Sequence, residues 1–594
     1  MTDLTDFFEE PRMLAYPPKR LRDLSGRLKV SQHKNIYEAD FEYGAQPLRW
    51  ESYTVGGGQI APKSATGGVQ MTLSTAAGDV TIRQSRPYHR YQPGKTMAMA
   101  SAINFGTANA GQRQRVGFFD DANGIFLEQA DPTATNPYGM FAVIRSDVGG
   151  VPVDTRISIE SWTGAAFAQT INWSAIQMVY LEYAWYGAGG LRWGIVVAGE
   201  PRILHEFAQG NSGAAWPWAR TGNLPVRYEQ RNLTAQSTGN TMYHWGVSVL
   251  VDGQVDDQRG FTYGYGMAAG TPARAPGASQ TRYPLLSFRY RAMGTLEYGV
   301  DSAYSGANGN LPASGSAISA VSSSTSATTV TLTGTPLVAG AWVGKYFFAR
   351  AATASITGIT ISGNVATATT AANPNYLTVG RWVIISGATP ATGVINGMVQ
   401  ITSVSASTFT FATTATGTVT GTITYQTGQG SIGRITANTT SALTVVDNVQ
   451  GGPLPVSPAV AGNYILGVIN RGQLLPRTLS IFSSANCTLE LIASAWSNPI
   501  SLTGSSFATM YSLGSLNSFA ERDVSATALS GGEVVYNTPL PAGALQTFDL
   551  SNFFALFNNV QGNQPDILTV AVTTPSTFGT GTVGASVICQ EAMS

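Results

Sequence analysis

Short segments in which apolar and polar residues alternate recur along most of the chain. Between residues 46 and 305 these segments are bounded by Gly, Pro, Asn or Asp, the residues that favour turns. This many evenly spaced strands predicts a large antiparallel β-sandwich of jelly-roll or lectin-like type. The region with the densest mixture of apolar and charged residues is 86–156, where a meander is expected. Its predicted strands are 97–103, 116–119, 124–128 and 139–145.

The start of that region, RPYHRYQPGK, alternates in the same way. The alternation predicts an entry strand of the sandwich that is held by Arg and Tyr contacts and meets either the N-terminal arm or a neighbouring subunit. One side of this strand would carry Arg86, Tyr88 and Arg90, and the other side would carry Pro87, His89 and Tyr91.

Changes in composition divide the rest of the chain. Residues 354–427 have strand patterns of their own and interrupt a stretch rich in small residues, which favours an insertion into a loop of another domain. A short helix is expected at 551–560, where Ser551 is a good N-cap. The predicted parts are an N-terminal arm at 1–45, the sandwich at 46–305, a middle β domain at 306–353 plus 428–472, an inserted small Ig-like β module at 354–427 and a C-terminal β-sandwich at 473–594.

The arm interleaves acidic and basic residues with spaced aromatic ones, and Pro17-Pro18 would break a helix. Two interpretations stay open. It is either an extended strap on its own first domain or a segment that reaches a neighbouring subunit.

Composition supports a folded, mainly β protein with little helix. Charged residues make up only 11% of the 594 residues, whereas 43% are hydrophobic, which is enough apolar surface for several cores. The formal net charge is zero, so nucleic acid is not an expected partner and association is favoured. There is no run of about 20 apolar residues, so we expect no membrane insertion and synthesis in the cytoplasm without a secretory leader.

Catalytic and metal-binding motifs are missing from the sequence. Cys487 and Cys589 could pair, although two buried free thiols are the favoured interpretation. The histidines have no metal-ligand spacing and are expected to be structural: His33, His89, His205 and His244. We assign no catalytic residue, cofactor or metal ligand.

Two further kinds of chemistry were weighed against structural roles. A pair of carboxylates could cleave a glycosidic bond, but the acids here have the density expected of turns and strand edges. The candidates are Asp120, Asp121, Glu128, Asp154, Glu182 and Glu206. A calcium loop would need oxygen ligands at alternate positions, but the spacing does not match an EF-hand and favours a solvated hairpin tip. Those candidates are Asp252, Asp256 and Asp257.

Tryptophans are frequent in the predicted first domain, where they either fill the core or form a platform for a glycan or a protein partner. Residues 215–220, AWPWAR, are flanked by Gly, Ser and Pro and are the best candidate platform. The candidate residues are Trp216, Trp218 and Arg220. The other tryptophans of this domain considered for the core are Trp162, Trp173, Trp185, Trp193 and Trp245.

Five segments of the predicted first domain carry a resemblance to known proteins: RPYHRYQPGK, RQRVGFFDDANGIFLEQ, VIRSDVGGVPVDTR, WYGAGGLRWGIVVAGE and LPVRYE. They resemble a domain of structural proteins from tailed bacteriophages. The C-terminal segments FDLSNFFALFNNVQGNQPDILTVAV and SVICQEA resemble the end of the same proteins, and YLTVGRWVIISGATP is similar to Ig-like modules inserted in phage tail proteins.

The resemblance implies a non-enzymatic structural component of the virion, most readily in the tail, fibre or baseplate. It also implies a homo-oligomer, with a trimer as first expectation, that contacts other virion proteins. One alternative is a carbohydrate-binding protein that recognises a glycan of the host surface, and another is a head or neck decoration protein. A glycan depolymerase is least favoured, because no β-helix repeat is present.

Overall fold

The structure of this chain is a computed structural model that describes most of residues 33–594. Leu24 is described as well. The gaps lie at 211, 254–260, 267–272, 291–292, 295–317, 325, 334–336, 350–352, 371–376, 378–381, 394, 406, 428–430, 448, 450–453, 455–463, 470, 495–499, 510–511, 514–515, 518–519, 552–554, 561–564 and 593–594.

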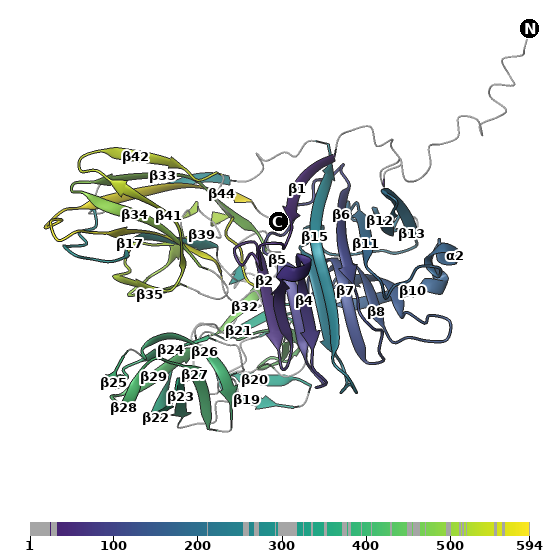
Figure 1. Ribbon diagram of the computed structural model, residues 1–594, viewed down its shortest axis with the longest axis horizontal. Helices are drawn as coiled ribbons and strands as arrows, with labels where there is room; N and C mark the ends of the chain where they lie inside the picture. Colours follow the sequence, from purple (N-terminus) through teal and green to yellow (C-terminus); the bar gives the residue numbers. More distant parts are fainter. Residues whose placement is uncertain are drawn as a thin grey trace, which may run out of the picture. The chain divides into compact units, whose positions relative to one another are not determined.

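The chain forms two compact units, and almost all of its regular structure is antiparallel β-sheet (Figure 1). The first unit extends to Gln258 but excludes two short segments, Pro47–Glu51 and Arg86–Tyr88. Those segments belong to the second unit together with residues 259–594. The expected mainly β fold with little helix is confirmed.

The first unit contains an eight-stranded sheet that runs from β13 to β3, with β1 attached to β15. In spatial order its strands are β13 (Glu200–Ala208), β12 (Gly190–Val197), β11 (Gln177–Tyr183), β6 (Met97–Asn104), β15 (Asn240–Asp252), β4 (Gly68–Leu73) and β3 (Gln59–Lys63), and β1 is His33–Ala39.

A seven-stranded sheet forms the other layer of the first unit. Four of its strands, β7 to β10, form a meander over residues 112–158, and β7, β8 and β9 correspond to three of the four strands predicted for the meander at 86–156. The predicted strand at 97–103 is β6 and lies in the eight-stranded sheet instead. The seven strands in order are β10 (Val153–Ser158), β9 (Met140–Ser146), β8 (Gly124–Ala130), β7 (Gln112–Phe119), β14 (Val226–Asn232), β5 (Val80–Ser85) and β2 (Trp50–Val55).

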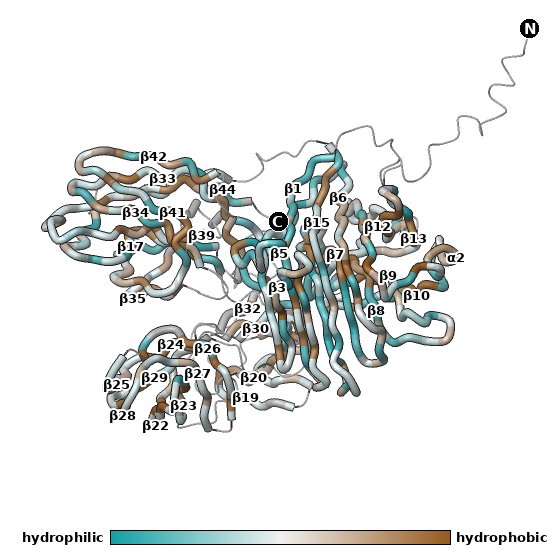
Figure 2. The backbone as a smooth tube through the Cα atoms, viewed as in Figure 1, coloured by the Kyte–Doolittle hydropathy of each residue, from teal (hydrophilic) through white to brown (hydrophobic). Residues whose placement is uncertain are grey.

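The two sheets pack face to face through one side of each strand. Tyr228 of β14 stacks on His244 of β15, with the ring centroids 3.9 Å apart. Its hydroxyl lies 2.5 Å from the hydroxyl of Ser101 on β6. Figure 2 shows hydrophobic and hydrophilic stretches interspersed along these strands. This alternation is the pattern that predicted the sandwich.

Helical structure in the described part of this unit is limited to single turns. These are η2 (Ser64–Thr66), η3 (Ile159–Ser161) and α2 (Ala165–Ala168). The segment that contains η3 and α2 connects β10 to β11. It is held by Trp162 and Trp173, whose rings lie edge to face at 6.2 Å.

The second unit contains a sandwich of two sheets built from the C-terminal strands. The strands β16 and β17, which the sequence placed in the first sandwich, pair here with β44 and β43, so the predicted boundary at 305 is corrected. One sheet has the order β16 (Phe261–Gly266), β44 (Val583–Ala592), β33 (Gln473–Ser483) and β42 (Leu545–Asp549). The other has the order β36 (Ala508–Thr509), β39 (Ala520–Asp523), β17 (Tyr283–Tyr290), β43 (Ile567–Thr573), β34 (Cys487–Ala493) and β41 (Glu533–Leu540).

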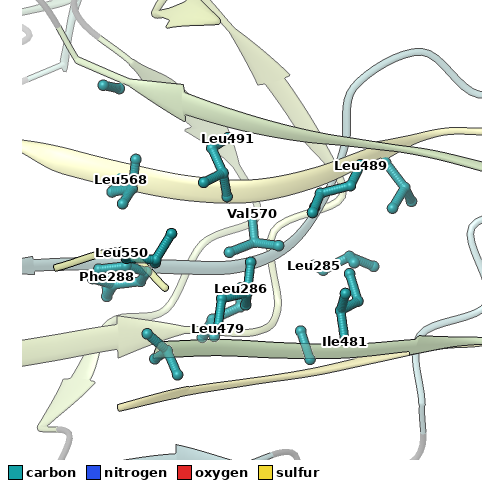
Figure 3. Packing of buried hydrophobic residues seen from close by; sticks show 14 of the residues in the cluster. Leu285, Leu286, Phe288, Leu479, Ile481, Leu489, Leu491, Leu550, Leu568 and Val570 are labelled. Carbon is teal, nitrogen blue, oxygen red and sulfur yellow. The ribbon is translucent and has the colours of Figure 1, made fainter. Parts of the chain in front are cut away.

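The core of this sandwich explains why β17 belongs to it. Leu286 on β17 and Val570 on β43 point toward Leu479 and Ile481 on β33, and all four are fully buried (Figure 3). Cys487 and Cys589 are buried free thiols, as favoured from the sequence. Two short pairs accompany the sheets: β35 (Ser501–Thr503) with β40 (Ala528–Ser530), and β37 (Ser512–Leu513) with β38 (Leu516–Asn517).

A third sheet of the second unit uses strands from both sides of the predicted insertion. Its hydrophobic core surrounds Trp342, which is fully buried. The strands in order are β18 (Met293–Gly294), β32 (Tyr464–Ile469), β21 (Tyr346–Ala349), β30 (Ser431–Asn438), β31 (Ala442–Asp447), β20 (Thr328–Leu332) and β19 (Ile318–Ser323).

The interrupting segment folds as a closed barrel of six strands, where the sequence predicted an Ig-like module. Closure pairs β22 with β29, so the main sheet of the module keeps no free edge. The barrel order is β22 (Thr353–Ser362), β23 (Val365–Thr370), β27 (Thr408–Ala412), β26 (Gly397–Val404), β24 (Trp382–Ser386) and β29 (Ile423–Thr427), and β25 (Thr389–Thr392) pairs with β28 (Thr416–Thr420).

Two local predictions are wrong. The described part of 551–560 is extended, because Leu556 forms a bridge with Leu474 through backbone hydrogen bonds of 3.1 and 2.9 Å. Residues 552–554 lie outside the described part. Residues 86–91 are irregular apart from one bridge between His89 and Leu224.

The predicted two-sided pattern at 86–91 also fails. Tyr88, His89 and Tyr91 are all buried, although alternation would have separated Tyr88 from the other two. Arg86 is held by long-range contacts within the second unit: it donates to the carbonyl of Pro47 at 3.1 Å and forms an ion pair with Asp566. Arg90 lies in the same irregular segment.

Two parts of the predicted N-terminal arm at 1–45 are described, Leu24 and residues 33–45, and His33–Ala39 form β1, which pairs with β15 of the first unit. A side chain at Gly190 of β12 would come within 3.1 Å of the Leu24 Cδ2 atom, so Leu24 lies beside the first unit of its own chain. The rest of 1–32 lies outside the described residues. In the described part of the chain, no helix has the length and apolar character needed to span a membrane.

Replacing Arg86 with Ala is expected to destabilise the protein strongly. The side chains of Arg86 and Asp566 are only 10% and 9% exposed, so the substitution leaves a buried carboxylate without its cation. We expect a loss of about 3 kcal/mol in the free energy of unfolding, measured by urea denaturation. The matched control is Arg282→Ala, because Arg282 is half exposed and its contact with Glu490 is 3.4 Å. A loss in the control as large as that in Arg86→Ala would contradict the role assigned to this ion pair.

Candidate functional site

One face of the seven-stranded sheet carries many charged side chains, which lie among a small cluster of buried aromatic and aliphatic ones. The strand register puts Arg115 of β7 opposite Glu229 of β14 on one side and opposite Glu128 of β8 on the other. We call this surface the arginine face. Its members are Arg113, Arg115, Arg145, Arg156, Arg227 and Arg231, with Glu128, Glu229 and Asp154.

Arg115 and Glu229 are at the centre of the arginine face. The Arg115 guanidinium donates from Nε to Glu128 at 2.7 Å and from Nη1 to Glu229 at 2.8 Å. The second oxygen of Glu229 accepts from Arg227 at 3.2 Å, and Arg227 also pairs with Asp121 at 2.7 Å. All of these side chains are buried, so the charges compensate one another with little help from solvent.

Two carboxylates of the arginine face, Glu229 and Asp154, are held in the ionised form. Burial alone would raise the pKa of Glu229, but Arg231, Arg115 and Arg227 outweigh burial and hold that pKa well below its usual value. Burial likewise acts to raise the pKa of Asp154. Its ion pair with Arg145, at 2.7 Å, instead lowers that pKa to about 2.

The six acids considered for glycoside hydrolysis therefore have structural partners. The Asp120 carboxylate accepts from the amides of Ala122 and Asn123, both at 2.8 Å, and shapes the turn after β7. On the eight-stranded sheet, Glu182 and Glu206 flank Arg192 at 3.5 and 3.6 Å. Among these six, Asp154 has a pKa lowered to about 2, so it stays ionised near neutral pH and cannot protonate a leaving group, as the first step of this hydrolysis requires.

The predicted platform lies in the segment between β13 and β14, and the structure separates its members. The Trp216 side chain is 71% exposed, whereas Trp218 is only 4% exposed and contributes to the core. Sequence patterns could not separate them because both stand among the same small residues. The other tryptophans considered for the core are buried or half-buried: Trp162, Trp173, Trp185, Trp193 and Trp245.

Arg220 is fixed by the two turns next to it. Its guanidinium forms a bidentate pair with Asp147, with contacts of 2.8 to 3.1 Å. Its backbone amide donates to Asn123 at 2.9 Å. Half of the Arg220 side chain stays exposed, so it can donate further hydrogen bonds to a ligand while its charge is balanced.

Tyr186 is a second exposed aromatic residue near Trp216, and the sequence analysis missed it. Trp185 donates from its indole nitrogen to the carbonyl of Ala219 at 2.8 Å, which joins the turn after β11 to the Trp216 segment. The Tyr186 side chain is 55% exposed. We call Tyr186, Trp216 and Arg220 the aromatic end of the first sandwich. Only the contact between two distant segments brings them together, so no local signal could have identified Tyr186.

Nothing in the described residues resembles a metal centre, since no cluster of three His, Cys, Asp or Glu side chains has suitable geometry there. His244 and His89 are buried, and burial lowers the pKa of His244 well below its usual value and that of His89 to about 3. Asp252 of the proposed hairpin tip lies 3.1 Å from His33. Asp256 and Asp257 lie outside the described residues.

The depressed pKa of Asp154 predicts how stability depends on pH. Because the folded pKa of about 2 lies below the unfolded value of about 3.9, the stabilisation is complete above about pH 4 and is lost as the pH falls toward 2. An Asp154→Asn variant should lose about 2 kcal/mol at pH 7 and much less at pH 2. Urea denaturation of both proteins at pH 7, 4 and 2 measures this difference. Equal losses at all three pH values would contradict the assignment.

Comparisons with known proteins identify no family for this chain. It matches no family model and no curated protein. Among solved structures it is similar to a glycosyl hydrolase family 16 protein from Mycobacterium smegmatis, with 11% identity, 36% of this chain and 100% of that chain covered, and a TM-score of 0.25. It is also similar to lectin I-B4 from Griffonia simplicifolia, with 10% identity, coverage of 36% and 99%, and a TM-score of 0.24. A glycoside hydrolase family 16 endo-glucanase from Bacteroides ovatus gives 10% identity, coverage of 36% and 99%, and a TM-score of 0.26. Similarity at this level says nothing about the activity of this chain.

Proposed function

We propose that this chain is a non-enzymatic carbohydrate-binding protein of a tailed bacteriophage particle, and that the aromatic end of its first sandwich holds the glycan. The observation that carries the proposal is the exposure of Trp216, at 71%, in a segment that Trp185 joins to the turn carrying the exposed Tyr186. Trp and Tyr side chains combine a large apolar face with a polar group that can stay hydrated, and they are enriched at binding surfaces.

The chemistry of the aromatic end suits a sugar. A Trp or Tyr ring offers an apolar face for the C–H groups of a pyranose, and its polar edge stays hydrated. Arg220 beside it can donate to sugar hydroxyls, and its bidentate pair with Asp147 reduces the entropy lost on binding because the side chain is already ordered. Since that pair is neutral overall, the aromatic end favours a neutral sugar.

The non-enzymatic part of the proposal rests on the arginine face. Glu229 has a strongly depressed pKa and three arginine partners, so it is unsuited to deliver a proton near neutral pH. The carboxylate of Glu182 likewise has structural partners. It accepts a hydrogen bond from the Tyr180 hydroxyl and forms an ion pair with Arg192. These arrangements support binding without cleavage.

The placement in a virion is supported by the resemblance of residues 86–95, 113–129 and 143–156 to phage structural proteins, and by the zero net charge, which favours assembly. We propose a tail, fibre or baseplate position and a homo-oligomer, with a trimer as the first expectation. A carbohydrate-binding protein in such a position would contact the host surface.

Removing the Trp216 ring is expected to weaken glycan binding. The Trp216→Ala variant should bind host surface polysaccharide at least about tenfold more weakly, since stacking contacts of this kind contribute on the order of 1–2 kcal/mol. Binding is measured by glycan array and by isothermal titration with the best ligand. Trp216→Phe, which keeps an aromatic face, should retain part of the affinity.

Phe167→Ala is the matched control, because Phe167 on α2 is also an exposed aromatic side chain. It should bind as the unmodified protein does. If neither the array nor host polysaccharide gives binding that depends on Trp216, the proposed function is wrong.

The location of the chain in the particle tests the virion assignment. A reconstruction of the whole phage should show density for the barrel of residues 353–427 and for both sandwiches in the tail, fibre or baseplate. Density at the capsid vertices would instead support a head decoration protein. A particle that lacks this chain would contradict the virion assignment and leave the glycan-binding test unaffected.

A further inference from the structure

One end of the arginine face places two arginines directly opposite each other. The register pairs Arg113 at the start of β7 with Arg231 near the end of β14. Like charges in this position destabilise a sheet unless something compensates them. Arg231 is compensated by Glu229, which lies 2.5 Å from its Nε. Arg113 forms no ion pair or side-chain hydrogen bond with any described residue, and its buried Nε has no partner there.

The carboxylates near Arg113 are already used by other arginines. Glu128 is bound by Nε of Arg115 at 2.7 Å and lies 2.6 Å from Nε of Arg156. On its other side Arg113 faces Ala130 of β8, which brings no charge. Asp131 accepts from the amide of Gly111 at 2.9 Å and lies 3.7 Å from Arg156. Positive charge is therefore in excess at this end of the sheet.

The pKa of Arg113 reflects the same excess of positive charge. Burial lowers the pKa of Arg113, and Glu128 offsets only part of this effect. Arg115 and Arg156 are close enough to lower that pKa further. An anion bound beside Arg113 would offset the repulsion that Arg115 and Arg156 exert on the Arg113 guanidinium.

Arg156 can contribute to the same site. Its guanidinium lies over the ring of Phe141, with 4.1 Å between the guanidinium carbon and the ring centroid, so the side chain is held in place. Its Nη2 has no hydrogen-bond partner among the described residues. Ordered guanidinium groups bind planar oxyanions through two parallel hydrogen bonds, which makes a carboxylate the best-fitting ligand.

We propose that Arg113, with Arg156 and Arg231 beside it, forms a binding site for a carboxylate group. The carboxylate belongs either to an acidic saccharide or to a small free organic acid. This site is separate from the aromatic end, because Arg113 begins β7 whereas the turn that holds Arg220 follows the end of that strand.

Thermal unfolding of the full chain tests the site, with tryptophan fluorescence as the signal. Sodium acetate and sodium glucuronate are each titrated against sodium chloride at equal ionic strength, with glucose as the neutral sugar. Both carboxylates should raise Tm more than chloride does, and Arg113→Gln should weaken the apparent affinity obtained from the concentration dependence of Tm at least about tenfold, since a lost charge-assisted hydrogen bond has this magnitude. Arg202→Gln is the control, because Arg202 is 58% exposed and its ion pair with Glu200 is long, at 4.0 Å.

The outcomes separate the two ligands and the two proposals. A stronger effect of glucuronate than of acetate identifies a saccharide, and equal effects identify the carboxylate alone. If Arg113→Gln fails to fold, Arg113→Lys keeps the charge without the planar fork and should show a partial loss. The site is refuted if carboxylates raise Tm no more than chloride does, or if Arg113→Gln responds as the unmodified protein. The Trp216→Ala variant should keep the carboxylate response even where it has lost glycan binding.

Discussion

The ion pairs around Arg115 and Glu229 are the interaction on which the first unit depends. Three neighbouring strands, β8, β7 and β14, each bring a buried charge to the same row, and each charge is compensated only in the observed register. A slip of one residue would turn these charges toward the core between the sheets. The cost of burying them unpaired would exceed the net stability of a typical domain. The network of ion pairs therefore selects the strand register of this sheet more than it adds to the net stability of the domain.

The same strands position the aromatic end. The turn after β7 presents Asn123 and the turn after β9 presents Asp147, and both hold Arg220 in the distant segment before β14. Because the ion pairs fix the register of β7, β8 and β9, the turns at their ends have little freedom to shift. An exposed ring such as that of Trp216 then rests on an ordered base, which reduces the entropy lost when a ligand binds.

Local patterns predicted the strands well and the long-range partners poorly. Alternation located β7, β8 and β9, and the change of composition located the inserted barrel. The boundary at 305 failed because β16 and β17 pair with strands roughly 280 to 330 residues later, and no local pattern records such a partner. Residues 86–91 alternate like a strand, yet their conformation follows from the contacts of Arg86 with Pro47 and Asp566. For the site, Trp216 was predicted, whereas the burial of Trp218 and the proximity of Tyr186 depend on packing between segments.

We propose two kinds of recognition at the two ends of one sheet, a carboxylate at Arg113 and a neutral sugar at the aromatic end. Arg113 and Phe119 are separated by the length of β7, roughly 20 Å at the usual rise per residue. A single sugar ring cannot contact both ends, so a ligand that uses both must be extended. At the aromatic end the charge of Arg220 is balanced by Asp147, which favours neutral sugar faces. At the other end the unbalanced charge of Arg113 favours an acidic group. A polymer with both neutral and acidic sugars would satisfy both ends at once, and binding at the second end would then be intramolecular and strengthened by its high effective concentration.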